Sequence, residues 1–191
     1  MSTNLETKTP KLNPDRTLFY FLVFGFIGWI FETIAIIFDC GQFMARGIFF
    51  IHYRPNGFPI IWGLPFILMY GIGGLLIVYV LKRWRDRPLV LFLLGMTFMT
   101  IFELLTSYFC EFALGTHYWQ YHNTPLTFDG RIGLIPSISW GVLSVLVIRF
   151  VEPALSRLYN RLESKRFFSQ VVYTLIAYVA ICLIIRRSTF Y

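Results

Sequence analysis

The sequence is poor in charged residues, which make up 14% of its 191 positions, whereas about 25% is usual in soluble domains. Hydrophobic residues reach 57%, against about 45–50% in soluble domains. A water-soluble fold of this size cannot hide that much apolar surface. The alternating segments of a membrane β-barrel are also lacking, and continuous apolar runs take their place. The composition therefore predicts an all-α, polytopic transmembrane helical bundle.

Cysteine is scarce, and its three positions show no CxxC or Cys/His metal-binding spacing. The three histidines lack a regular ligand spacing such as HExxH. The sequence also lacks a Walker A motif, a nucleophile elbow and a dinucleotide fingerprint. We therefore expect no metal, no cofactor and no ATPase activity in the chain itself, and a non-enzymatic role is favoured over an enzyme. For Cys40 and Cys110, free thiols are favoured over a disulfide, which sequence alone cannot establish.

Five apolar runs are each suited to cross a hydrocarbon core of about 30 Å. We expect them at residues 17–38, 58–81, 89–113, 131–150 and 169–185. Residues 1–16 are expected to form a disordered cytoplasmic segment, residues 17–187 a single transmembrane domain, and residues 188–191 a short tail. The first run is expected to stay in the membrane as a signal anchor. The polar stretch after the fourth run reads as a loop or a surface helix.

Lysine is absent from all five predicted spans, and the net charge of +7 comes largely from basic residues in short connections. Membrane orientation explains this charge better than nucleic acid does, so we expect the lipid bilayer and no nucleic acid as a partner. With five crossings, twelve of the 17 basic residues share the side of the N-terminus: Lys8, Lys11, Arg16, Lys82, Arg83, Arg85, Arg87, Arg149, Arg157, Arg161, Lys165 and Arg166. The positive-inside rule then places the N-terminus in the cytoplasm and the C-terminus outside.

A polar stripe follows one face of the third apolar run. Its members recur at spacings of three or four residues, as a helix requires: Thr97, Thr100, Glu103, Ser107 and Glu111. Lipid would leave these groups unsatisfied, so the stripe is expected to face protein or a water-filled cavity. Glu32 in the first run also needs a partner, because an ionisable group in hydrocarbon costs roughly 2.5–3.5 kcal/mol.

Arginines in the outer segments are the expected partners of these acids, because guanidinium groups form planar, bidentate pairs with carboxylates. Two interpretations stay open: the groups pair only to hold the bundle together, or they line a pocket that binds a polar or anionic ligand. The candidate pocket residues lie mostly in the predicted outer half: Glu32, Arg46, Arg54, Glu103, Ser107, Glu111, Trp119, Tyr121, Asp129, Arg131 and Trp140.

Several segments in a fixed order resemble a known family. They are GWIFE (28–32), ARG (45–47), GFPIIWG (57–63), ELLTSYFCE (103–111) and HYWQYHNTPLTFDGRIGLIPSISWG (117–141). Together they resemble the putative ABC-transporter type IV permease family of small bacterial membrane proteins, over roughly residues 18–153. The family often has an acid where this chain has Gln120, and Asn where it has Ala45, so a ligand role for that acid does not carry over.

The resemblance implies a transport component of the bacterial cytoplasmic membrane, with a separate ATPase subunit or further copies of the chain as protein partners. It would bind a small polar or anionic solute in the outer-half pocket. Two alternatives from the residues stay open. One is a membrane-embedded enzyme or lipid-head-group binder that uses paired carboxylates and arginines. The other is a non-catalytic envelope scaffold whose polar groups are all paired.

Overall fold

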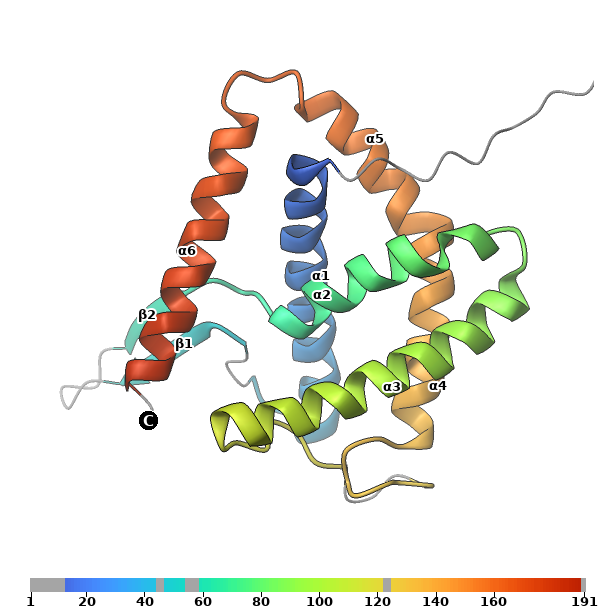
Figure 1. Ribbon diagram of the computed structural model, residues 1–191. Coiled ribbons are helices and arrows are strands. Elements are labelled where there is room, and N and C mark those ends of the chain that lie inside the picture. Colours follow the sequence, from blue (N-terminus) through green and yellow to red (C-terminus); the bar gives the residue numbers. More distant parts are fainter. Residues whose placement is uncertain (1–12, 44–46, 54–58, 122–124, 190–191) are drawn as a thin grey trace, which may run out of the picture. The chain divides into compact units, whose positions relative to one another are not determined.

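The computed structural model describes residues 13–43, 47–53, 59–121 and 125–189, which are helical apart from one short hairpin (Figure 1). The elements are α1 (Pro14–Cys40), β1 (Phe49–Tyr53), β2 (Pro59–Gly63), α2 (Leu68–Leu76), η1 (Ile77–Leu81), η2 (Lys82–Trp84), α3 (Pro88–Leu114), α4 (Leu134–Leu146), η3 (Val147–Val151), α5 (Glu152–Leu162) and α6 (Phe168–Thr189). They form two compact units, residues 1–75 with 157–191, and residues 76–156, and each is described by itself.

Four helices are long and apolar enough to cross a membrane among the described residues: Pro14–Phe38, Pro88–Ala113, Leu134–Leu162 and Phe168–Ile185. The polytopic helical bundle expected from composition is therefore confirmed, and the chain is a multi-pass membrane protein. The fourth predicted span is longer than expected, because α4, η3 and α5 follow one another without a break. The stretch predicted as a loop or surface helix is thus largely the continuation of that span.

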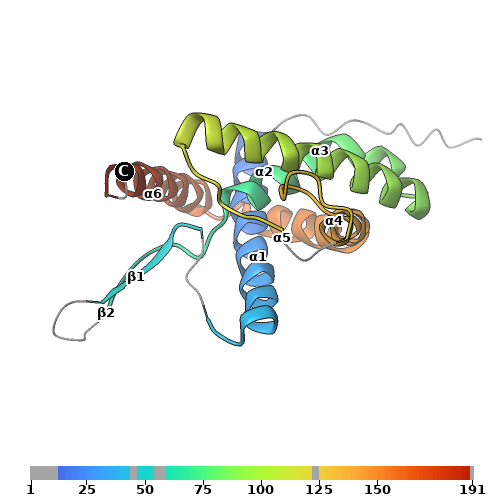
Figure 2. The same cartoon turned by 90° about the horizontal axis from the view of Figure 1, so that it is seen from below.

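The second predicted span, residues 58–81, is only partly helical. Its first part is β2, which pairs with β1 in an antiparallel hairpin from Phe49 opposite Gly63 to Tyr53 opposite Pro59 (Figure 2). Pro65 disfavours helix at the residue before it, so a helix begins only at Leu68. From Leu68 through η1 and η2 to Trp84 the helical chain is about 27 Å long. It is shorter than a hydrocarbon core of about 30 Å and is not among the four helices long and apolar enough to cross a membrane.

The start of α1 is defined by a local cap. The Asn13 side chain accepts a hydrogen bond from the backbone N–H of Asp15 at 3.1 Å, and Pro14 occupies the first helical turn. The helix therefore begins three residues before the predicted start at Thr17. The rest of the segment expected to be disordered, residues 1–12, lies outside the described residues.

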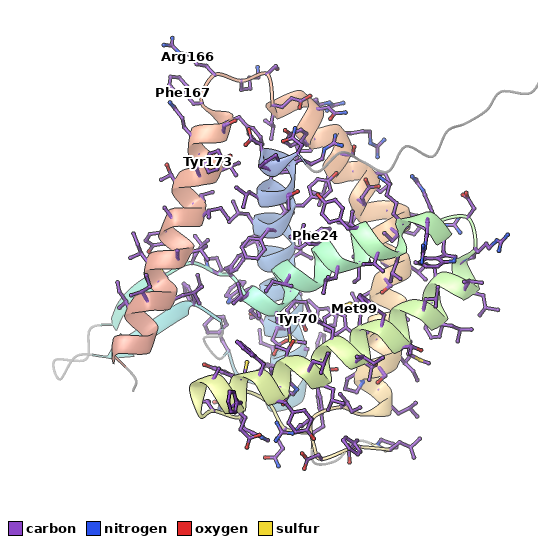
Figure 3. The ribbon with its side chains drawn as sticks, in the orientation of Figure 1. Phe24, Tyr70, Met99, Arg166, Phe167 and Tyr173 are labelled. Carbon is purple, nitrogen blue, oxygen red and sulfur yellow. The ribbon has the colours of Figure 1, made fainter. Side chains whose placement is uncertain are left out.

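In the first unit, α1 contacts both α2 and α6. The backbone N–H of Ile67 donates to the carbonyl oxygen of Gly25 at 3.1 Å, and a Cβ on Gly25 would collide with the ring of Phe66. A glycine is therefore required for α2 to start so close to α1. At the start of α1, Asp15 accepts hydrogen bonds from the hydroxyls of Ser169 at 2.7 Å and Tyr173 at 2.8 Å on α6 (Tyr173 is labelled in Figure 3).

The second unit is built on the packing of α3 against α4. Small residues bring the two helices together, because a Cβ on Gly95 would collide with Ser144 and one on Gly141 would press on Phe92. Two π-helical segments, η1 and η3, also contact each other. The core between these elements includes Leu91, Met99 (labelled in Figure 3) and Ile148, all with no exposed surface.

Candidate functional site

The candidate site lies in the second unit, where the segment between α3 and α4 turns back over the end of α3. The turn is tight: the backbone N–H of Arg131 donates to the carbonyl of Phe128 at 3.0 Å. Asp129 and Gly130 both have positive φ, 52° and 65°, a conformation that Asp tolerates better than most residues and glycine adopts freely. This turn places the carboxylate of Asp129 within hydrogen-bonding distance of the Arg131 guanidinium, which also reaches acceptors on α3.

Arg131 is buried, with 5% of its surface exposed, and its guanidinium uses all three of its nitrogens. Nε donates to Oδ2 of Asp129 at 2.7 Å, Nη1 donates to Oγ of Ser107 at 3.0 Å, and Nη2 donates to Oε2 of Glu111. The guanidinium carbon also lies 4.1 Å from the centre of the Tyr108 ring, a cation–π contact. Arg131 thus connects the interhelical turn to two successive turns of α3.

Asp129 and Arg131 lie before the membrane span that begins at Leu134, and their ion pair shifts the pKa of both side chains. The hydrogen bond from Arg131 lowers the pKa of the Asp129 carboxyl below its usual range, although desolvation opposes the shift. The same hydrogen bond raises the pKa of the Arg131 guanidinium above its usual value. Both groups are therefore charged at neutral pH, and each stabilises the charge of the other.

Glu111 has a second neighbour, because Nε2 of His117 lies 3.1 Å from the same oxygen, Oε2, that Arg131 contacts. The other oxygens of Glu111 and Asp129 accept no hydrogen bond in the described part of the chain. The side chains of these two residues are 48% and 55% exposed. Two carboxylates therefore share one guanidinium, and each keeps one oxygen open to an approaching group.

Glu103 lies two helical turns further into α3, and its surface is 3% exposed. Its Oε1 accepts a hydrogen bond from the hydroxyl of Tyr121 at 2.7 Å, and its Oε2 accepts one from Nε1 of Trp140 at 3.1 Å. Such donors stabilise a carboxylate that is removed from water. Glu103 therefore joins α3 to α4 and to the segment after α3.

The segment after α3 is held against the Arg131 turn by its aromatic residues. Nε1 of Trp119 donates to the carbonyl oxygen of Arg131 at 3.0 Å, and the backbone N–H of Tyr121 donates to the carbonyl of Gly130 at 2.8 Å. A Cβ on Gly130 would lie 3.0 Å from Cγ of Gln120, so there is little room for a larger residue. Gly130 thus lets the segment that contains Gln120 pack closely against the turn before Arg131.

The structure brings eight of the eleven predicted site residues together in this unit: Glu103, Ser107, Glu111, Trp119, Tyr121, Asp129, Arg131 and Trp140. Glu32 belongs to the first unit, where its Oε2 accepts a hydrogen bond from Tyr70 at 2.8 Å. Arg46 and Arg54 both lie outside the described residues. Their roles in a pocket stay predictions.

The polar stripe of α3 is buried only at its centre. Glu103 and Ser107 are buried as the helical spacing predicts, but Thr97 is exposed and Glu111 is half-exposed. The stripe was expected to face protein or a water-filled cavity: Glu111 contacts Arg131 and His117 although it is half-exposed, and Thr97 is exposed.

Three contributors were missed by the sequence reasoning. Tyr108 and His117 contact the cluster, but Tyr108 lies off the polar stripe, and His117 stood out only as a metal candidate. Glu152, buried at the start of α5, pairs with Lys82 at 2.6 Å. Glu152 could have been noticed in the sequence, because it is an acid just after the fourth apolar run. The described residues contain no group of three His, Cys, Asp or Glu residues that could hold a metal ion.

The thiols of Cys110 and Cys182 are free, and nothing is described of the Cys40 side chain.

The chain was compared with known proteins and families. No curated protein and no solved structure matches it significantly. A family model described as "Putative ABC-transporter type IV" matches residues 19–186, nearly the whole membrane part. The segments that carried the resemblance all fall within this range. The chain therefore belongs to the putative ABC-transporter type IV family.

Proposed function

We propose that the protein is the membrane component of a transport system and that the cluster around Arg131 receives a small polar solute with a positively charged group. The family supports the transport role, and the cluster supports the choice of charge. The observation that carries the proposal is that Arg131 is already engaged by two carboxylates and a hydroxyl. An anionic solute would have to displace these acceptors, so an anion is disfavoured here.

The open carboxylate oxygens favour a cation instead. Glu111 and Asp129 together carry two negative charges against the single positive charge of Arg131, and both are accessible. Tyr108, 42% exposed, adds an aromatic ring at the same place. Carboxylates beside aromatic rings attract ammonium groups through charge and through the ring quadrupole. The polar solute expected from the sequence is therefore retained, and its favoured charge is positive.

A direct test compares binding of choline with binding of its uncharged isostere, 3,3-dimethyl-1-butanol, to the purified protein in a neutral detergent. We expect choline to bind at least tenfold more tightly, and Glu111→Gln to remove that preference. Asp86→Asn, which changes an exposed acid in the turn between η2 and α3, is the matched control and should leave the preference intact. Equal binding of the two probes, or tighter binding of phosphate, would show that the cluster does not select cations.

We further propose that a separate ATPase subunit drives the transport, since the chain has no phosphate-binding motif of its own. The observation behind this is the family to which the chain belongs. Affinity purification of the chain from its native membrane, followed by mass spectrometry, should recover a protein with a Walker A motif in constant ratio. If instead only further copies of the chain are recovered, the scaffold alternative becomes the better interpretation.

A further inference from the structure

Two buried polar atoms of α1 have no hydrogen-bond partner among the residues that the structure describes. They are Nε1 of Trp29 and Oγ1 of Thr33, and Thr33 is 93% buried. Both lie within the membrane-spanning part of α1. Water is not available in hydrocarbon to satisfy such groups, so an unpaired donor there is costly and calls for a partner.

Among the described helical hydroxyls, Thr33 and Thr100 are buried without a hydrogen-bond partner, and Thr33 is the one that has an unpaired indole N–H one turn away on the same helix. The hydroxyls of Thr106, Ser137, Ser139 and Ser144 each donate to the carbonyl oxygen four residues earlier, at 2.7 to 3.0 Å. This local bond is the ordinary way for a helical Ser or Thr to satisfy itself in a membrane. The hydroxyl of Thr33 does not make it, and is therefore free to donate to a group from outside the helix.

Trp29 and Thr33 are four residues apart, so they lie on one face of α1, one turn above the other. Glu32 lies beside them, with its carboxylate held by the hydroxyl of Tyr70 from α2 (Tyr70 is labelled in Figure 3). The indole of Trp29 also contacts two aromatic rings, Phe43 and Phe49, with centroids 6.4 and 5.6 Å away. The face thus combines two free donors, one nearby acid and an aromatic surround.

The chemistry of these groups defines the class of ligand. An indole N–H only donates, so the ligand must present an oxygen that accepts. The carboxylate of Glu32 next to the pair disfavours a phosphate or another anion at that position. The aromatic rings favour an apolar body attached to the oxygen. A neutral hydroxyl or ester carbonyl on an amphiphilic molecule satisfies all three requirements.

We propose that Trp29 and Thr33 form a binding site for the neutral oxygen group, a hydroxyl or ester carbonyl, of a molecule with an apolar body. The site belongs to the first unit alone and does not depend on the function proposed for the Arg131 cluster. The same oxygen chemistry is offered by a bilayer lipid and by a free polyol. The experiment therefore has to separate these two sources.

The test measures thermal unfolding of the full chain in a neutral detergent with three probes: monoolein, glycerol and the anionic lipid phosphatidylglycerol. At about one hundred times its Kd, a bound ligand raises the folding equilibrium constant about 100-fold. We expect monoolein to raise the unfolding temperature of the wild type more than phosphatidylglycerol does. Glycerol at the same concentration should have no effect if the source is a lipid, and an equal effect if the source is a free polyol.

Three variants decide whether the named residues are responsible. In Thr33→Val, which keeps the shape but removes the donor, and in Trp29→Phe, which removes the donor but keeps an aromatic ring, monoolein should bind about tenfold more weakly. Thr106→Val removes a hydroxyl that is already satisfied within its helix and should keep the full response. If Thr33→Val is instead more stable than the wild type and no probe raises either unfolding temperature, the hydroxyl is simply unsatisfied and no site exists. A larger, Trp29-dependent response to phosphatidylglycerol would overturn the neutral class of ligand.

Discussion

Nζ of Lys82 lies 2.6 Å from Oε1 of Glu152, and this ion pair joins two helices at the points where each leaves a π-helical segment. Lys82 directly follows η1, and Glu152 directly follows η3. The side chain of Glu152 is 5% exposed, whereas that of Lys82 is 36% exposed. The pair therefore neutralises a carboxylate that the fold has taken out of water. π-helical turns are rare interruptions of α-helical geometry. The ion pair links the ends of η1 and η3 and so helps to fix these two turns against each other.

Breaking this pair from the lysine side should be more harmful than removing it entirely. We expect Lys82→Met to lower the free energy of unfolding by about 2–4 kcal/mol, because Glu152 is left buried without its partner. The double variant Lys82→Met with Glu152→Leu should recover a large part of that loss. Thermal unfolding of the two single variants and the double variant measures the coupling. Lys165→Met is the control at an exposed lysine, and purely additive effects would argue against the pair.

Arg131 should tolerate no replacement, including lysine. A lysine keeps the charge, but its donors sit on a single nitrogen and cannot reproduce the planar fork that reaches Asp129, Ser107 and Glu111 from three nitrogens. We expect Arg131→Ala to destabilise the second unit by about 3–5 kcal/mol, and Arg131→Lys to restore less than half of that. Unfolding temperatures in detergent provide the measurement, and a Lys variant as stable as the wild type would mean that the hydrogen-bond geometry is unimportant.

Acid should weaken the Arg131 turn through Asp129. Its pKa is lower in the folded protein than in the unfolded chain, so the ionised carboxylate adds stability above the unfolded value of about 3.9. That contribution is lost as the pH falls through the lower, folded pKa. Unfolding measured between pH 6 and pH 2.5 should therefore show a decrease below about pH 4 that Asp129→Asn reduces. Asp86→Asn is the control, and an unchanged profile in Asp129→Asn would assign the decrease to other acids.

Hydropathy and helical period account for most of what could be predicted. The four long spans follow from continuous apolar runs, and the burial of Glu103 and Ser107 follows from their spacing along α3. The hairpin strand β2 was missed because a short apolar run with β-branched residues suits a strand and a buried helix equally. Only the position of Pro65 favoured the strand.

The partners of Arg131 were predictable only in kind. The sequence predicted an arginine partner for the acids of the α3 stripe, and Glu111 has one in Arg131, but Asp129 was not predicted as the second partner. The choice depends on the two left-handed residues of the turn before Arg131, whose effect on side-chain direction is not readable from periodicity. The pair of Lys82 and Glu152 was missed for a related reason. The two residues are 70 positions apart, and no local pattern connects them.

The number of crossings decides where the two termini lie. We predict a cytoplasmic N-terminus and an external C-terminus, because an odd number of crossings places twelve of the 17 basic residues inside. The short element from Leu68 to Trp84 must then cross, which requires the bilayer to thin slightly around it, since its length of about 27 Å is below a core of about 30 Å. Single cysteines introduced at Ser2 and Thr189 in a cysteine-free background should react with a membrane-impermeant maleimide from opposite sides. A third cysteine at Asp86, in the turn between η2 and α3, should behave like the one at Ser2. If Ser2 and Thr189 are labelled from one side and Asp86 from the other, the element enters and leaves the membrane on one face. If all three are labelled from the same side, the element spans but a later predicted crossing does not.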